Sequence, residues 1–321
     1  MKFKHTFHVF VDNFSVIYKQ LLFRLVVLLI SGLICWAGVY PFIKTFIDSE
    51  QLNTIIEGAK GFITSLLNGQ TGELQSLSEK VQTAYAELNE LLNTKLTEAV
   101  LSGLLILLIT VVSKWFMGLG NYATASVIND KMALRAKQPF LGTLIRNLKN
   151  ASIYNAIYVP LSVLYDVLVV VAMFFLFFTL LNSVVYFFIC LFLFVLAVVV
   201  AITFKMTVTS DWLPALIRGK MKHGAAIKYT FSRKNKNTLN VMSNFAVIVL
   251  IVFALNMAAL ILTLGVGLLL TVPSSYVIII SFEFVNYYDR EEIKYSVDKN
   301  TIISPEKERP LSREEFFRGD D

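Results

Sequence analysis

The sequence predicts an all-α, polytopic transmembrane helical bundle of about six helices, with a helical hairpin outside the cytoplasm. Three observations indicate this fold class. The 321 residues are 56% hydrophobic and 16% charged, with a mean hydropathy of +0.64, which is too apolar for a typical soluble domain. Several uncharged runs reach the ~20 residues that a helix needs to cross ~30 Å of hydrocarbon. The basic residues outside these runs are concentrated in two connecting segments.

Six spans follow from the uncharged runs. The run from Asn237 to Phe282 contains 46 residues and would extend ~69 Å as one helix, so it must cross the membrane twice. Gly265, Gly267 and Pro273 mark the expected break in this run. A tight turn is expected at 181–183, between the third and fourth spans. The expected spans are 21–43, 99–119, 154–181, 184–204, 241–264 and 268–287.

The charges of the connecting segments predict the orientation. Segment 121–153 carries five basic residues against one acidic residue, and segment 205–240 carries eight against one. Segment 44–97 carries seven acidic residues against four lysines. Because Lys and Arg accumulate in cytoplasmic loops, we expect the two basic segments and both termini in the cytoplasm. The protein is then a multi-pass protein of a plasma membrane, and we expect a bacterial one.

Four regions are expected along the chain. Residues 1–43 form an N-terminal segment and the first span, and 44–97 form an extracytoplasmic, coiled-coil-like helical hairpin. Residues 98–288 contain the other five spans and two basic amphipathic cytoplasmic loops. Residues 289–321 form a polar cytoplasmic tail that contains two prolines, so we expect it to be extended or mobile.

The hairpin is predicted by two apolar stripes with heptad-like spacing. One stripe covers 52–66, the other covers 74–91, and Gly69 and Gly72 lie between them. Two such stripes joined by a glycine turn are typical of antiparallel helices. The alternative is a pair of amphipathic helices that lie on the outer leaflet. The hairpin would offer a surface to a protein partner.

Each basic loop also contains an apolar stripe. One follows Pro139, at a position suited to the start of a helix, and the other follows Ser210, which is a suitable N-cap. Both stripes predict helices at the membrane interface. Nearby cations could bind anionic lipid headgroups, although topology determination alone would also explain them. These candidate lipid contacts are Arg146, Lys149, Arg218, Lys220, Lys222 and Lys228.

The sequence contains no catalytic, metal-binding or cofactor-binding motif. His5, His8 and His223 are not paired with acids or cysteines at metal-ligand spacing, and the two cysteines, Cys35 and Cys190, lie in apolar runs. No glycine-rich phosphate loop or nucleophile elbow is present. We therefore expect neither an enzyme nor a bound metal or cofactor. The membrane accounts for the basic residues, so we expect no nucleic-acid partner.

One acidic residue, Asp166, interrupts the third span. A carboxylate near the centre of a bilayer costs ~2.5–3.5 kcal/mol on insertion scales, so it should face the bundle and meet a partner. Asn256 and, less favourably, Lys114 are the polar partners that we expect. Asp166 then forms either an ion or proton site or an interhelical hydrogen bond. Glu283 and Lys205 are expected at the inner interface, where long side chains reach water and need no special role.

Residues 122–288 resemble the membrane domains found beside bacterial glycerophosphodiester phosphodiesterases and in related six-helix proteins. In that family, a basic amphipathic segment with a small residue near its middle precedes a helical hairpin. The corresponding segments here are 130–142 (DKMALRAKQPFLG) and 211–228 (DWLPALIRGKMKHGAAIK). The resemblance covers about half of the chain and does not include the phosphodiesterase domain, so it implies a membrane bundle without hydrolase activity.

These observations favour a non-enzymatic membrane protein that acts in envelope or membrane organisation through lipid or protein contacts. The alternative is a small transporter or channel subunit, in which Asp166 and the break between Gly265 and Pro273 supply a polar path. A membrane-embedded enzyme ranks third, because a single carboxylate does not make an acid and base pair.

Overall fold

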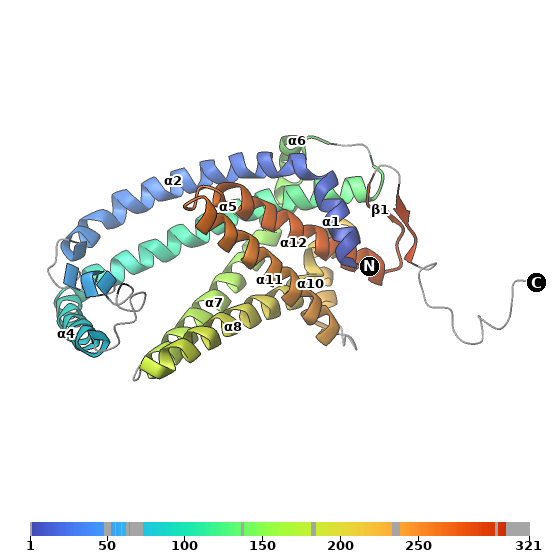
Figure 1. Ribbon diagram of the computed structural model, residues 1–321. Helices are drawn as coiled ribbons and strands as arrows, with labels where there is room; N and C mark the ends of the chain where they lie inside the picture. Colours follow the sequence, from blue (N-terminus) through green and yellow to red (C-terminus); the bar gives the residue numbers. More distant parts are fainter. Residues whose placement is uncertain are drawn as a thin grey trace, which may run out of the picture. The chain divides into compact units, whose positions relative to one another are not determined.

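The computed structural model confirms the all-α fold class and contains six helices long and apolar enough to cross a membrane (Figure 1). The chain is thus a multi-pass integral membrane protein. The spanning helices are α2 (Phe14–Ile47), α5 (Leu96–Met132), α7 (Leu148–Leu180), α8 (Val184–Thr209), α11 (Thr238–Leu262) and α12 (Leu268–Arg290). The structure describes residues 2–47, 53–54, 56–58, 60–61, 64, 73–135, 138–180, 184–232, 238–298 and 301–305.

Shorter elements lie outside the spans. Among the described residues these are α1 (Lys2–Asp12), α4 (Glu73–Thr94), α6 (Phe140–Arg146), α9 (Trp212–Ile217), α10 (His223–Ser232), β1 (Tyr295–Ser296) and β2 (Ile302–Ile303). The described residues divide into two compact units. The first contains Met1–Leu25, Trp115–Met173 and Phe192–Asp321, and the second contains Val26–Lys114 and Phe174–Leu191.

The predicted break in the long apolar run is confirmed. Helix α11 ends at Leu262 and α12 begins at Leu268, and Gly265 adopts a φ of +89°, which glycine reaches without a Cβ clash. Pro273 does not contribute to the break, contrary to the prediction, because it lies inside α12. The expected turn at 181–183 lies outside the described residues.

Helix α12 is the central helix of the first unit. More than half of the residues in its most apolar window are buried, against 17% or less in each of the other spans. It packs on α1, α9 and α11, and Phe282 lies against both Phe3 of α1 and Phe245 of α11. The other spans of this unit therefore keep most of their apolar surface for lipid.

Helix α1 is an element that the sequence prediction missed. Three of its residues are fixed against the C-terminal part of the chain: Lys2 donates to Asn286, the His5 ring is 3.0 Å from the Tyr295 hydroxyl, and Phe3 stacks on Phe282. Burial of the ammonium group lowers the pKa of Lys2. The eleven-residue helix is too short and too polar to be found by a search for apolar runs.

The start of the tail after α12 packs on the core of the first unit, whereas the sequence predicted an extended or mobile tail. Strands β1 and β2 pair antiparallel, with Tyr295 opposite Ile303. Tyr295 and Val297 are buried in the same core as Val9 of α1 and Tyr288 of α12. Their aromatic and β-branched side chains supply apolar surface that the polar composition of the tail had masked. The segment beyond residue 305 lies outside the described residues.

The apolar stripe after Ser210 forms α9, and its side chains pack on protein. Trp212, Leu213 and Leu216 are buried, and the Trp212 ring contacts Tyr154 and Tyr158 of α7 edge-on. The N-cap is Asp211 instead of Ser210. The stripe thus faces the protein core, and the location of α9 at the membrane interface stays a prediction.

The stripe after Pro139 forms α6, and its residues divide between two environments. Phe140 is buried against Phe23 of α2, whereas Leu141 and Ile145 are 65% and 72% exposed. Pro139 occupies the N-cap position of α6. Large exposed apolar side chains on a short helix of a membrane protein agree with the predicted interfacial location.

In the second unit, α2 and α5 pack closely. A Cβ atom added at Gly38 would lie 2.5 Å from a Leu105 methyl carbon, so glycine permits this approach. Helix α4 covers the second stripe of the predicted hairpin. Most of the first stripe, 52–66, lies outside the described residues, so the pairing of the two stripes stays a prediction.

Candidate functional site

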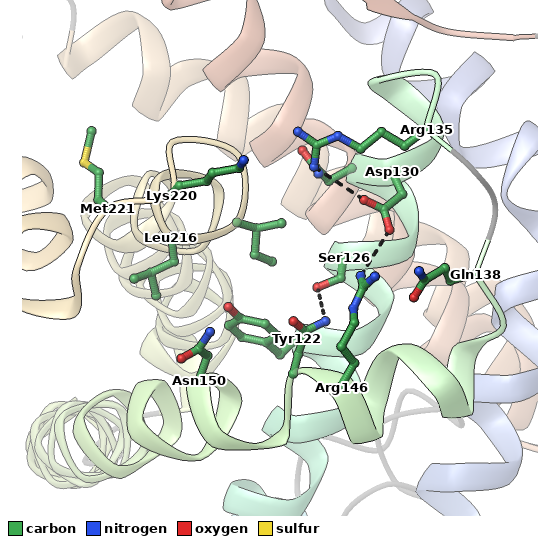
Figure 2. Close-up of a pocket in the computed structure, with 13 residues that line it drawn as sticks. Tyr122, Ser126, Asp130, Arg135, Gln138, Arg146, Asn150, Leu216, Lys220 and Met221 are labelled. Atoms are coloured by element: carbon green, nitrogen blue, oxygen red, sulfur yellow. Dashed lines mark hydrogen bonds and ion pairs between the residues drawn. The ribbon is translucent and has the colours of Figure 1, made fainter.

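A polar pocket of about 550 Å³ lies at one end of the first unit, where α5, α6, α7 and α9 meet (Figure 2). Its walls come from the end of α5, the connection to α6, the start of α7 and the turn that follows α9. These are the two segments that the sequence identified as strongly basic. The pocket is therefore built where the cations of two loops, distant in the sequence, come together.

The end of α5 forms the floor of the pocket. Tyr122, Ser126 and Asn129 follow each other at spacings of four and three residues, so they share one helix face, and Asp130 lies beside them. All four are at least nine-tenths buried. This face carries polar side chains beyond the apolar part of α5, which explains why α5 continues to Met132 instead of ending near residue 119.

Asn129 is held in a defined orientation. Its Oδ1 atom accepts a hydrogen bond of 3.0 Å from the Tyr288 hydroxyl, whereas its Nδ2 atom is buried and has no acceptor among the described residues. Buried amide groups nearly always find a partner, and each one that is left without it costs ~1–3 kcal/mol. A donor that lines a polar pocket in this state is suited to an acceptor oxygen from a ligand.

Two arginines share the carboxylate of Asp130. Arg135 Nη1 lies 3.8 Å from Asp130 Oδ1, and Arg146 Nη2 lies 3.5 Å from Oδ2. Figure 2 shows the two side chains approaching Asp130 from two sides. Arg135 is positioned by a Schellman motif, in which the left-handed Leu134 (φ 53°) directs the Arg135 N–H to the Asp130 carbonyl oxygen.

Lys220 lies on another wall of the pocket. It adopts a left-handed φ of 50° after α9, and the following N–H, from Met221, donates to the Ala215 carbonyl oxygen. A positive φ is uncommon for a residue with a side chain, and such residues cluster at binding sites. In Figure 2 the Lys220 amine points across the pocket toward the Asp130 side.

The lining groups give the pocket an excess of positive charge. Arg135, Arg146 and Lys220 contribute three cations against the single carboxylate of Asp130. The neutral polar lining is dominated by amides, from Asn129, Gln138, Asn147 and Asn150, and Asn147 Nδ2 is 3.5 Å from the Ser126 hydroxyl. Amide N–H groups and guanidinium groups are donors, so the pocket is suited to an anion with several acceptor oxygens.

The structure brings together only part of the predicted set of lipid contacts. Arg146 and Lys220 line the pocket. Arg218 instead lies 5.1 Å from the Tyr288 ring centre, which is a cation–π contact. The remaining three are exposed and do not line the pocket: Lys149, Lys222 and Lys228. Sequence reasoning missed Arg135 and the amides, although the polar spacing along 122–129 could have indicated them.

The predicted intramembrane polar site is not formed by the expected residues. Asp166 pairs with Lys205 of α8 at 2.6 Å, and the Lys205 amine also lies 5.9 Å from the Tyr165 ring centre. Asn256 accepts from Thr271 and donates to Ser275, both in α12. The prediction that Asp166 meets Asn256 is therefore wrong, and so is the view that Lys205 only reaches toward water. Asp166 and Lys205 therefore neutralise each other, and each lies four residues or more from the nearer end of its helix.

Arg24, near the start of the first predicted span, is a second buried charge. It lies within α2, is 6% exposed, donates to Asn121 of α5 at 2.7 Å, and stacks 3.6 Å from the Tyr276 ring centre of α12. Gln20 donates to the same Asn121 oxygen. Helix α2 begins before its apolar run, and Arg24 is enclosed by groups from α5 and α12.

Comparison with known proteins adds no assignment: no family model, curated protein or solved structure matches this chain. Across the described parts of the chain, no group of three His, Cys, Asp or Glu residues could hold a metal ion. The candidate site thus rests on the geometry of the pocket alone.

Proposed function

We propose that this protein is a non-enzymatic membrane protein that contributes to membrane organisation by binding anionic phospholipid headgroups in the pocket at its basic end. The observation that carries the proposal is the convergence of Arg135, Arg146 and Lys220 on one pocket that contains a single carboxylate. Basic pockets between spanning helices on the cytoplasmic side are suited to lipid headgroups. The buried Asn129 donor supplies a further group for a phosphate oxygen.

The proposal requires the pocket to face the cytoplasmic leaflet of the plasma membrane. The basic charge of segments 121–153 and 205–240 supports this orientation, with both termini in the cytoplasm. We expect cysteines at Lys149→Cys and Lys222→Cys, in a cysteine-free background, to react with an impermeant maleimide only after permeabilisation. A cysteine at Glu87→Cys in α4 should react in intact cells. Labelling of the first two positions in sealed cells would contradict the topology.

Binding can be tested on the purified full-length protein with lipids that share acyl chains. We expect phosphatidylglycerol to bind and phosphatidylcholine to bind much more weakly, as measured by native mass spectrometry and by the shift in melting temperature. Arg146→Ala should weaken phosphatidylglycerol binding about fivefold, since one cation near an anionic headgroup contributes ~1 kcal/mol.

Lys149→Ala is the matched control for Arg146→Ala. Lys149 lies three residues further along the chain, is exposed, and does not line the pocket. Lys149→Ala removes one positive charge from the same segment as Arg146→Ala does. A non-specific attraction to the leaflet would therefore weaken equally in both variants. Equal effects of the two substitutions would contradict a specific pocket.

A further inference from the structure

We propose that the pocket selects a phosphomonoester headgroup, the dianion of a lipid such as phosphatidic acid, over the monoanionic phosphodiester of ordinary phospholipids. The inference rests on the proposed function, because it names the ligand class of the same pocket. Four features of the described residues support it: the net charge of the lining, the convergence of two guanidinium groups, the number of donors in the lining, and the apolar face of α6.

The net charge of the lining matches a dianion. Three cations and one carboxylate leave a formal excess of two positive charges. A phosphomonoester carries about −1.5 to −2 at neutral pH, since its second pKa is ~6, whereas a phosphodiester carries one negative charge. A diester would leave about one positive charge unmatched in a pocket whose floor is buried. A monoester leaves almost none.

The two guanidinium groups can reach the same phosphate. Both contact the carboxylate of Asp130, so they lie close together, yet their distances to it, 3.8 and 3.5 Å, exceed the ~2.7–2.9 Å of strong charge-assisted hydrogen bonds. Their N–H donors are thus not saturated by Asp130. Convergence on one point favours one doubly charged phosphate over two singly charged phosphates held apart in the same lipid.

The number of acceptors points the same way. A terminal phosphate presents three oxygens outside its ester bond, and a diester presents two. The donors available to them are the two guanidinium groups, the Lys220 amine and the Asn129 amide, whose Nδ2 is buried without an acceptor among the described residues. The third free oxygen of a phosphomonoester can therefore accept a hydrogen bond from one of these donors.

The apolar face of α6 indicates that the phosphate belongs to a lipid. Arg146, the last residue of α6, enters the pocket, while Leu141 and Ile145 of the same helix are exposed to the outside. In a membrane protein such a face contacts acyl chains. A lipid beside α6 would place its chains along these residues and its headgroup in the pocket.

The test compares phosphatidic acid, phosphatidylglycerol, cardiolipin and phosphatidylcholine on the purified full-length protein at pH 7.5. We expect phosphatidic acid to bind at least about fivefold more tightly than phosphatidylglycerol, the factor that corresponds to ~1 kcal/mol for one further charge match. Equal affinities for these two, or tighter binding of cardiolipin, would overturn the monoester inference and leave the proposed function standing. Equal binding of all four lipids would overturn both.

Acidification provides a second readout. Lowering the pH from 7.5 to 5.5 protonates the monoester. The ratio of the affinity for phosphatidic acid to that for phosphatidylglycerol should therefore fall toward one. Ionisable groups that face the ligand are Tyr122, Asp130, Arg135, Arg146 and Lys220, and the phosphatidylglycerol series reports any titration of these groups. An unchanged preference at pH 5.5 would contradict the inference.

Two further experiments complete the test. One asks whether the phosphate belongs to a lipid, and the other changes the charge of the pocket in a variant whose folding is checked by its melting temperature. Inorganic phosphate at millimolar concentration should not displace phosphatidic acid, and complete displacement would assign the pocket to free phosphate. Asp130→Asn keeps the shape of the side chain and raises the excess charge of the lining from two to three, so it should tighten phosphatidylglycerol binding and leave the preference for phosphatidic acid in place. Loss of all binding by this variant at an unchanged melting temperature would overturn the charge argument.

Discussion

Replacing Arg290 with leucine is expected to lower the free energy of unfolding by about 3–5 kcal/mol, because Asp211 loses the partner that neutralises it. The two side chains form an ion pair of 2.5 Å, and their exposed fractions are only 14% and 11%. Truncating one member of a buried pair leaves the other charge desolvated without its ion-pair partner. Thermal unfolding of the purified variant in detergent measures the loss.

Arg290 also organises its neighbours, which makes the expected effect large. It donates to the Tyr229 hydroxyl at 3.1 Å, and that hydroxyl donates to Glu291. Burial of the phenol, followed by its hydrogen bond to Glu291, raises the pKa of Tyr229 to about 12, so the phenol keeps its proton at physiological pH. Arg290 thereby joins α9, α10 and the end of α12.

A double substitution separates the ion pair from simple loss of packing. Asp211→Asn combined with Arg290→Leu removes both charges, so it should be less destabilised than Arg290→Leu alone by ~0.5–3 kcal/mol. Lys228→Ala, on the exposed face of α10, should change stability by less than about 0.5 kcal/mol. If the double variant were no more stable than the single variant, the pair would not be the source of the effect.

Lys205→Met should produce the second large effect, a loss of about 2.5–3.5 kcal/mol. This substitution leaves the Asp166 carboxylate without its 2.6 Å ammonium partner in a span that faces hydrocarbon. Asp166→Asn should cost less, because a lysine near the end of α8 can extend its amine toward water. The double variant Asp166→Leu with Lys205→Met should recover most of the stability, since matched apolar replacements of ion pairs are close to neutral.

The same variants distinguish a structural pair from a transport site. If the pair only joins α7 and α8, the stable double variant keeps every other property of the protein. If Asp166 conducts ions or protons, proteoliposome flux disappears in the double variant in spite of its stability. We expect the first result, because the carboxylate is already matched by a cation.

The six spans could be predicted from the sequence because the length of an apolar run is a local property, which can be counted without knowing the fold. Helix ends could not, since α5 continues to Met132 on polar residues that keep helical geometry without apolar character. Helix α9 shows the other limit: its apolar stripe was found, but a stripe does not specify whether it meets lipid or protein.

The candidate site was predictable only in part. Arg146 and Lys220 were named as lipid contacts from local charge, but their meeting with Arg135 depends on how α5, α6 and α9 pack. The pairing of Asp166 had the same difficulty, because several polar residues at similar depth could have been its partner. Only the packing of α7 on α8 selects Lys205 among them.

The enclosure of Arg24 has a consequence for how the protein is made. Synthesis delivers α2 first, yet the groups that accept its charge come from Asn121 in the second span and Tyr276 in the last. An arginine near the end of a lone apolar helix extends toward the membrane surface, whereas Arg24 in the complete fold is enclosed by protein. The contacts that enclose Arg24 are therefore complete only once the last span has been made, and a chain stopped before residue 276 lacks the ring that covers its guanidinium.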